Sequence, residues 1–167
     1  MTDTIDRSYL EIKSINYLIE SRSPGMKCSI NLLKPDDFQI NKFFYKRVGK
    51  KHRWKDRLAW PEKEWIKYSS NPKVETYILK VLEELAGYFE LIHHSELQEI
   101  EIAYFGILEE YYQKQLGGYL LTSAIKKSFE KKIKRVWVHT CTFDHKNALN
   151  NYLARGMKIF KKETIKI

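Results

Sequence analysis

This chain of 167 residues has only two cysteines, Cys28 and Cys141, far apart in the sequence. Two isolated cysteines are too few for a disulfide framework or a cysteine-rich zinc cluster. The chain also lacks a charged-then-apolar leader and any long apolar run near its start, so we expect no signal peptide and no membrane partner. These absences together favour the reducing cytoplasm.

Candidate metal ligands and nucleic-acid motifs are equally scarce. His93 and His94 have no further ligand at metal-binding spacing, so we expect no metal. The net charge of +9 and the pI near 9.4 favour anionic ligands, although a lysine-rich surface would explain them as well. The basic and aromatic segment 43–60 keeps a nucleic-acid-binding module as an alternative. Because no DNA-reading helix pair or RNA-stacking motif accompanies it, we do not expect a nucleic-acid partner.

Apolar periodicity predicts one domain over residues 1–167, in which residues 1–25 are an N-terminal extension of uncertain structure. Residues 8–20 are ambiguous between strand and helix, and the run 28–33 is the better first strand. The pattern then predicts helices over 38–48, 61–69, 116–131 and 145–155, the last capped by Asp144, and strands over 75–82, 86–94, 98–108, 135–141 and 157–167. This order is typical of an α/β (α+β) fold with a mixed, twisted sheet and helices on its faces.

The segment 99–119 carries the clearest functional signal. Its apolar strand ends shortly before Leu116-Gly117-Gly118, which opens an amphipathic helix. The first amides of a helix have no partner within the helix, and the helix dipole adds positive potential at the same place. Such a junction is suited to hold a phosphate group.

Two stretches, ILEEYYQKQLGGYLL and HKNALNNYLARGMKIF, resemble the acetyl-coenzyme A (acetyl-CoA) binding core of the GNAT (Gcn5-related) N-acetyltransferases. Ile107, Glu110 and Tyr111 stand at the Val and Glu-Tyr of the V-x-P-E-Y pattern, and Gly117 stands at the second glycine of the loop. Tyr152 and Gly156, four residues later, match the Tyr and Gly of the Leu-Tyr-x-x-x-Gly-Phe pattern. The departures from the family include Tyr112 for Arg or Gln, Gln115 for the first Gly, and His145 for Asn.

The resemblance implies a mostly antiparallel GNAT-like sheet, acetyl-CoA as co-substrate and no metal. The acceptor would be the primary amine of a small molecule or peptide, acetylated directly in a ternary complex. The residues implied to bind the coenzyme are Phe105, Gly106, Ile107, Tyr112, Gln113, Lys114, Gln115, Leu116, Gly117, Gly118, Tyr119, His145, Ala148 and Tyr152.

Two residues are candidates for proton transfer, because an acceptor amine is almost wholly protonated near neutrality. Glu101 alternates with apolar neighbours on a central strand, where similar enzymes often place the base. It could instead be solvated or ion-paired, and Glu99 shares its face. Tyr152 would protonate the departing thiolate, or pack in the core. His139 and Thr140 could line the coenzyme, but a lone histidine in such a strand is more often structural.

Two further possibilities stay open. The glutamine at position 115 keeps a non-catalytic coenzyme-binding protein of GNAT-like fold as an alternative to the enzyme. The open sheet edge left by the closing strand 157–167 could pair with a second copy, so a homodimer is possible.

Overall fold

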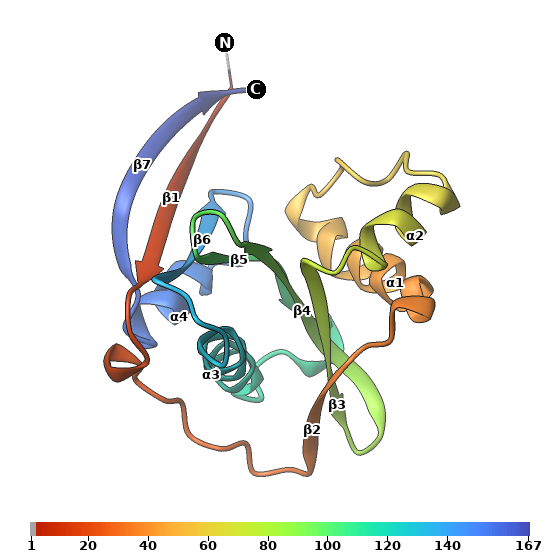
Figure 1. Cartoon of the computed structure of the whole chain (residues 1–167), viewed down its shortest axis with the longest axis horizontal. Coiled ribbons are helices and arrows are strands. Elements are labelled where there is room, and N and C mark those ends of the chain that lie inside the picture. Colours follow the sequence, from red (N-terminus) through yellow and green to blue (C-terminus); the bar gives the residue numbers. More distant parts are fainter. Residues whose placement is uncertain (1–2) are drawn as a thin grey trace.

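The structure, a computed structural model that describes residues 3–167, is built on one twisted seven-stranded sheet (Figure 1). Its strand order is β2-β3-β4-β5-β6-β1-β7, and every neighbouring pair is antiparallel except β5 and β6. The strands are β1 (Thr4–Ile12), β2 (Cys28–Leu32), β3 (Val74–Val81), β4 (Glu84–His94), β5 (Glu99–Ile107), β6 (Arg135–Cys141) and β7 (Lys158–Lys166).

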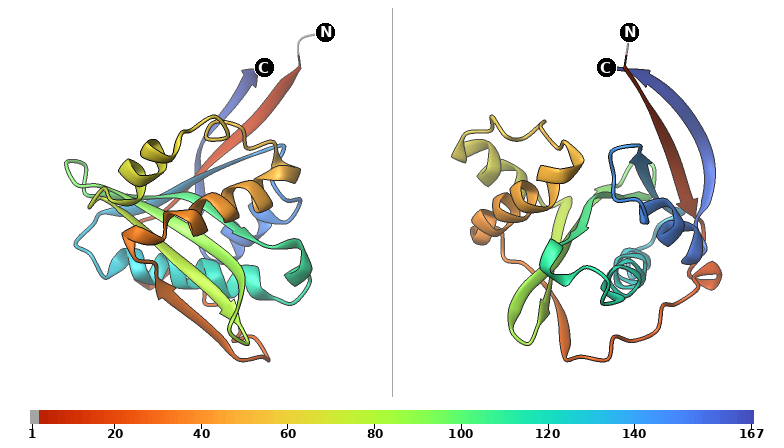
Figure 2. Two further views of the ribbon diagram at one scale, coloured as in Figure 1. Left: turned by 90° about the vertical axis from the view of Figure 1, so that its right-hand side faces the viewer. Right: turned by 180° about the vertical axis from the view of Figure 1, so that it is seen from behind.

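Four α-helices cover the two faces of this sheet. The helices α1 (Phe38–Gly49) and α2 (Glu62–Ser69) lie on one face, and α3 (Leu116–Phe129) and α4 (Ala148–Ala154) lie on the other (Figure 2). Short 3-10 turns occupy 15–17, 35–37, 50–52 and 109–111. The strands β1 and β7 extend together beyond the helices as a curved arm.

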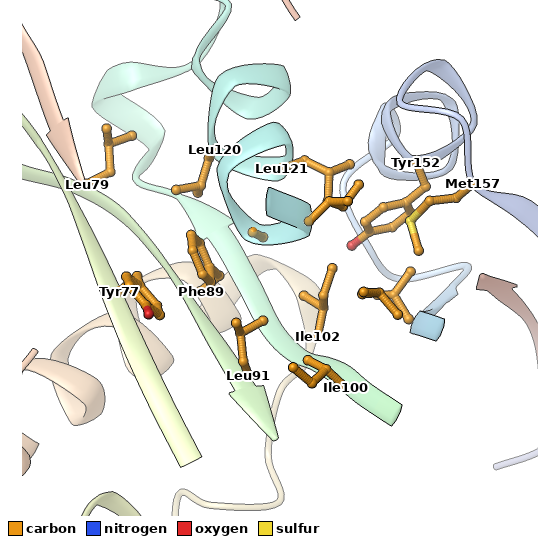
Figure 3. Close-up of a cluster of buried hydrophobic side chains, with 14 of the residues drawn as sticks. Tyr77, Leu79, Phe89, Leu91, Ile100, Ile102, Leu120, Leu121, Tyr152 and Met157 are labelled. Carbon is orange, nitrogen blue, oxygen red and sulfur yellow. The ribbon is translucent and has the colours of Figure 1, made fainter. Parts of the chain in front are cut away.

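The larger apolar core lies between the sheet and the helices α3 and α4 (Figure 3). Alternate side chains of β3, β4 and β5 point to it, and α3 contributes Leu116, Leu120, Leu121 and Ile125, all nearly inaccessible to water. A smaller core under α1 joins Phe44 to Tyr88, whose rings stack 4.9 Å apart. Burial of the apolar stripe of each helix fixes both layers on the sheet.

The structure confirms all four expected helices and the strands of the regions 75–108, 135–141 and 157–167. The run 28–33 does contain a strand, β2, but the interpretation of this run as the first strand was wrong, because β1 precedes it and lies between β6 and β7. Only the end of this strand alternates, with Leu10 and Ile12 buried on either side of Glu11, and three consecutive polar residues, 6–8, interrupt the pattern before it. Its position depends on partners more than 120 residues away, which local periodicity cannot reveal.

The expectation that Asp144 caps the last helix was also wrong. Helix α4 begins at Ala148, after Asn147. The Asp144 carboxylate instead accepts hydrogen bonds from Thr140 Oγ1 (2.6 Å) and Cys141 N (3.0 Å), so it closes the turn that follows β6. An aspartate can cap a turn as readily as a helix, and the sequence does not distinguish the two.

None of the helices within residues 3–167 has both the length and the apolar composition of a membrane span.

Candidate functional site

The candidate site begins where the two parallel strands separate. Pairing between β5 and β6 ends at Glu101 and Trp137, although β5 continues to Ile107. Beyond that point β5 pairs only with β4, so its other edge is free. A cavity of about 1280 Å³ fills the gap and extends from the first turn of α3 to β1 and β7. Ligand pockets of small molecules usually measure about 300–1,000 Å³, so this one has room for two reactants.

The loop before α3 forms one end of the cavity. Gln113 and Gln115 both adopt left-handed backbone conformations, with φ of 62° and 61°. Gln115 is the N-cap residue, and its side chain makes no capping hydrogen bond. The first amides of α3 therefore remain available to an anion, in addition to the positive end of the helix dipole.

Only some of the loop residues that the resemblance implies for coenzyme binding face the cavity. Tyr112, Gln113, Gln115, Leu116, Gly117 and Gly118 line the cavity, whereas Lys114 and Tyr119 lie outside its wall. The Leu116 side chain is buried in the core, so only its backbone can face a ligand. A Cβ atom on Gly117 would approach only Asn151 Nδ2, at 3.6 Å, whereas one on Gly118 would collide with Arg155 and Ser21.

The end of β5 forms the wall of the cavity next to the loop. Phe105, Gly106 and Ile107 all line it. A Cβ atom on Gly106 would lie 2.2 Å from Val48 Cγ1, so the glycine allows α1 to pack closely against this strand. The backbone groups on the free edge of β5 can pair with an extended ligand in the manner of an added strand.

Tyr152 lies on α4 and faces the same gap. Its side chain is 6% exposed, its ring meets Phe105 edge-to-face at 6.3 Å, and it lines the cavity. Its hydroxyl end points away from α4, toward the side chains of Leu121 and Ile102 (Figure 3). Burial, with the nearby charge of Asp144, raises the pKa of Tyr152 well above its usual range, so the hydroxyl keeps its proton at neutral pH.

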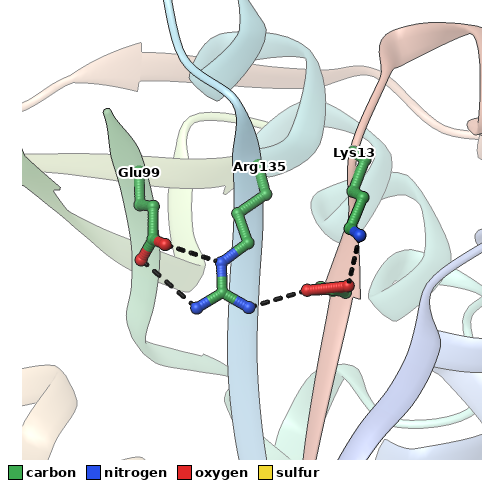
Figure 4. Close-up of polar contacts among 4 residues, drawn as sticks. Lys13, Glu99 and Arg135 are labelled. Atoms are coloured by element: carbon green, nitrogen blue, oxygen red, sulfur yellow. Dashed lines mark hydrogen bonds and ion pairs between the residues drawn. The ribbon is translucent and has the colours of Figure 1, made fainter. Parts of the chain in front are cut away.

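The two glutamates of β5 have different surroundings. Glu101 lines the cavity and is 3.0 Å from His94 Nε2 through Oε1. Glu99 accepts hydrogen bonds from Arg135 Nε (2.8 Å) and NH2 (3.3 Å), and Arg135 also bonds Glu11 of β1 (2.7 Å), which pairs with Lys13 (Figure 4). This ion-pair network joins β5, β6 and β1 and occupies Glu99, whereas Glu101 contacts His94 through one oxygen and faces the cavity.

A contact between two loops closes the cavity on the side of α1. His52 Nδ1 lies 2.9 Å from the Phe143 carbonyl oxygen, and the Arg53 guanidinium lies 4.3 Å from the Phe143 ring centroid. The ring of His145 packs edge-on against Tyr112 at 4.9 Å. Partial burial and the neighbouring positive groups, among them His52, lower the pKa of His145. Ala148, the first residue of α4, is half-buried against the main core and also lines the cavity.

The far part of the cavity has an aromatic and charged lining. Trp54 and Tyr104 meet edge-to-face at 4.9 Å, and Asp56 and Arg57 lie beside them. The buried Arg57 guanidinium donates to Glu90 Oε1 (3.0 Å), and Glu90 is completely inaccessible to water. This ion pair fixes the segment after α1 against β4, so that its aromatic side chains form a defined wall.

Sequence reasoning missed several residues of this lining. It noted the segment 43–60 as a basic and aromatic surface that could bind nucleic acid, and it did not single out Tyr104, Asp56 or Arg7. Arg7 of β1 belongs to the lining only because β1 lies beside β6. His139, considered above as a structural histidine, is exposed on the cavity side of β6. The alternation of VWVHT could have indicated that His139 and Trp137 share a face, opposite to the buried valines.

No group of three or more His, Cys, Asp or Glu side chains within residues 3–167 is arranged to hold a metal ion. The donor set fits a different ligand. Uncapped helix amides at one end suit an anionic group, the free strand edge in the middle suits an extended chain with amide groups, and the buried, protonated tyrosine can donate a proton.

The comparisons with known proteins concern the family and the fold of the chain. Residues 38–157 match the Acetyltransferase (GNAT) family. No curated protein matches the chain. Among solved structures, an aminoglycoside acetyltransferase from an uncultured soil metagenomic sample, in complex with trehalose, is similar with a TM-score of 0.64 at 15% identity. That match covers 77% of this chain and 86% of the other.

Two larger proteins share the fold over nearly the whole chain. A GCN5-related N-acetyltransferase from Kribbella flavida has a TM-score of 0.70 at 12% identity, over 96% of this chain and 57% of its own. One from Sphaerobacter thermophilus has a TM-score of 0.70 at 10% identity, over 98% of this chain and 52% of its own. The chain thus spans little more than half the length of these two proteins, and the likeness at such low identity concerns the fold.

Proposed function

Because this chain belongs to the GNAT acetyltransferase family, we propose that it transfers the acetyl group of acetyl-CoA to a primary amine. Transfer would be direct, with both reactants bound in one ternary complex. The observation that carries this proposal is the continuous cavity at the divergence of β5 and β6, which reaches from the α3 amides to Glu101 and Tyr152. A cavity of this form places two reactants end to end, which is the main requirement for direct transfer.

Each part of the cavity has its own task in this proposal. The amides of Gln113 and of residues 115–118 hold the pyrophosphate, and the free edge of β5 at residues 105–107 pairs with the pantetheine arm and polarises the thioester carbonyl. Tyr152 donates its proton to the departing sulfur. Glu101 supplies a negative charge where the acceptor ammonium must lose its proton.

The acceptor is proposed only as a class. Some structural neighbours are aminoglycoside acetyltransferases, which supports a small-molecule amine, and a peptide amine fits the same chemistry. The acceptor would enter beside Trp54, Tyr104 and Asp56, where aromatic rings and carboxylates can bind a cation. A cytoplasmic location and a homodimer stay predictions.

Calorimetric titration with acetyl-CoA tests the coenzyme site, and dephospho-CoA serves as a control for the adenosine phosphate. Two variants of Gly117 test whether backbone amides hold the pyrophosphate. Gly117→Ala keeps the amide and has space for its Cβ, whereas Gly117→Pro removes the amide in the first turn, where proline is tolerated. We expect wild-type affinity for the alanine variant and about tenfold or greater weakening for the proline variant.

The transfer step is tested by incubating the protein and acetyl-CoA with single primary amines and measuring the release of free coenzyme A thiol. The amines would include alkylamines, a polyamine, aminoglycosides and a lysine-containing peptide. Saturable thiol release with at least one amine supports the enzyme. Tight binding of acetyl-CoA without thiol release would favour the non-catalytic alternative.

A further inference from the structure

His139 occupies a special position at the divergence of the two parallel strands. The last paired residues are Glu101 of β5 and Trp137 of β6. His139 follows Trp137 by two residues, so its side chain lies on the same face of the sheet as Glu101 and Trp137. Both His139 and Glu101 line the cavity. The imidazole and the carboxylate therefore face the gap from its two sides.

The ring of His139 is supported on one side and open on the other. The Tyr9 ring of β1 packs against it at 5.6 Å, and the Tyr9 hydroxyl donates to Glu163 of β7 (3.2 Å). The side chain itself is exposed at the cavity. Three other histidines hydrogen-bond through a ring nitrogen, His52 to Phe143, His94 to Glu101, and His145 to Asn147. Within the described residues, the ring nitrogens of His139 have no such partner.

The charged groups around His139 come from four elements. Arg7 approaches from β1, Glu101 from β5, Glu163 from β7, and Asp144 from the turn after β6. Partial burial and the positive charge of Arg7 lower the pKa of His139, and the three carboxylates oppose this effect. The net direction is downward, so the imidazole is neutral at pH 7 and has a free lone pair.

We propose that His139 is a catalytic base of the acetyl transfer, and that Glu101 stabilises the imidazolium that forms. This inference rests on the proposed function. His139 takes one proton from the acceptor ammonium, and the freed amine nitrogen forms a bond to the acetyl carbon while the carbon–sulfur bond breaks. Tyr152 gives its proton to the sulfur and recovers one from the new amide nitrogen. His139 then releases its proton to water at the exposed side of the ring.

The geometry favours His139 over Glu101 as the group that takes the proton. One oxygen of Glu101 is already bonded to His94, whereas the His139 nitrogens are free. A base whose pKa lies near the working pH combines a high fraction of the correct form with a useful driving force, and histidine fulfils this better than a carboxylate. The negative charge of Glu101, on the opposite side of the gap, stabilises the imidazolium that His139 becomes.

Nuclear magnetic resonance titration of the free protein tests the electrostatic part without any substrate. The His139 signal is assigned as the one missing in His139→Gln. Loss of a positive neighbour in Arg7→Met is expected to raise the pKa of His139, and loss of a negative neighbour in Glu101→Gln to lower it. A His139 pKa that responds to neither substitution would overturn the arrangement.

Kinetics test the catalytic part, with an amine that supports thiol release by the wild-type protein. We expect His139→Gln to reduce kcat about 100-fold, to leave calorimetric acetyl-CoA affinity unchanged and to abolish the acidic limb of the pH profile. In Arg7→Met the acidic limb should move to higher pH, by the same amount as the pKa of His139 measured by nuclear magnetic resonance. A purely structural role would leave the limb in place.

The outcomes distinguish the two proposals. Failure of the wild-type protein to bind acetyl-CoA would overturn the proposed function, and the role of His139 with it. Binding without thiol release for any amine would also remove the catalytic role. Normal binding and turnover, with an unchanged pH profile in His139→Gln and a lost acidic limb in Glu101→Gln, would overturn the role of His139 alone.

Discussion

At the scale of single residues, the best-protected charge of the protein is the Glu90 carboxylate. It accepts hydrogen bonds from Arg57, from Asn41 Nδ2 (3.0 Å) and from the Tyr68 hydroxyl (2.7 Å). The Arg57 guanidinium lies 4.0 Å from the Tyr68 ring centroid and 4.2 Å from that of Tyr104. Burial alone would lower the pKa of Arg57. The charge of Glu90 and the surrounding tyrosines outweigh this effect, so that the pKa of Arg57 is raised above its usual value. The Arg57 guanidinium therefore stays charged.

Breaking this pair from one side should cost about 3–5 kcal/mol of the free energy of unfolding, since a buried charge is then left without its partner. We expect this loss in Glu90→Leu, measured by urea denaturation. Arg57→Met combined with Glu90→Leu should lose less than the sum of the single variants, because no uncompensated charge remains. Strict additivity would show that the two side chains do not stabilise each other.

Tyr152 is the second residue whose surroundings decide its chemistry. Its raised pKa means that the hydroxyl remains a proton donor throughout the neutral range. Tyr152→Phe removes the proton and keeps the ring against Phe105, so we expect kcat to fall about 100-fold with unchanged acetyl-CoA affinity. Steady-state kinetics and calorimetry on the same preparation measure both. Equal turnover in the variant would remove Tyr152 from the mechanism.

At the scale of elements, the contact between α1 and β5 depends on the missing side chain of Gly106. A Cβ atom there would lie 2.2 Å from Val48 Cγ1, and the β-branched valine has little freedom to move. We expect Gly106→Ala to lower the free energy of unfolding by about 1–3 kcal/mol.

Two variants serve as controls in the same denaturation experiment. Gly25→Ala places its Cβ in open space and should stay within about 0.5 kcal/mol of wild type. Val48→Ala in the Gly106→Ala background should recover part of the loss, because it removes the colliding methyl groups. If Gly106→Ala alone is as stable as wild type, α1 does not pack as tightly as described.

At the scale of the whole molecule, β1 connects the edge strand β7 to the rest of the sheet. It pairs with β6 over Arg7–Ile12 and with β7 over Thr4–Glu11, and β6 and β7 have no ladder with each other. Its inner residues Leu10 and Ile12 belong to the main core. On the outer edge, β7 exposes Lys158, Lys161, Lys162 and Lys166, which disfavours edge pairing between copies through like-charge repulsion.

A chain shortened to begin at Ser14 should therefore fail to unfold cooperatively, because β7 loses its neighbour and the core loses two buried side chains. Thermal denaturation followed by circular dichroism measures this. A synthetic peptide of residues 3–13 should restore the transition by strand addition. A cooperative transition in the shortened chain without the peptide would show that β1 is dispensable.

The sequence was most informative where the signal is local. Leu116, Leu120, Leu121 and Ile125 recur at helical spacing and are buried as expected. The alternation in β3, β4 and β5 predicted their strands for the same reason, since a side chain on a regular element faces one side only. The sequence could not predict that Arg57 contacts Glu90, or that Arg7 approaches His139, because the two residues of each pair are 33 and 132 positions apart along the chain.

By itself the sequence determined the helices, most of the strands, the glycine-containing junction before α3 and the resemblance to one family, because each rests on neighbours along the chain. The tertiary structure alone decided the position of β1, the pairing of Glu99 with Arg135 and the open surroundings of Glu101 and His139. Strand order and burial arise from contacts between distant segments. The chemistry of the site depends on them, since a charge or a free lone pair is set by what surrounds it.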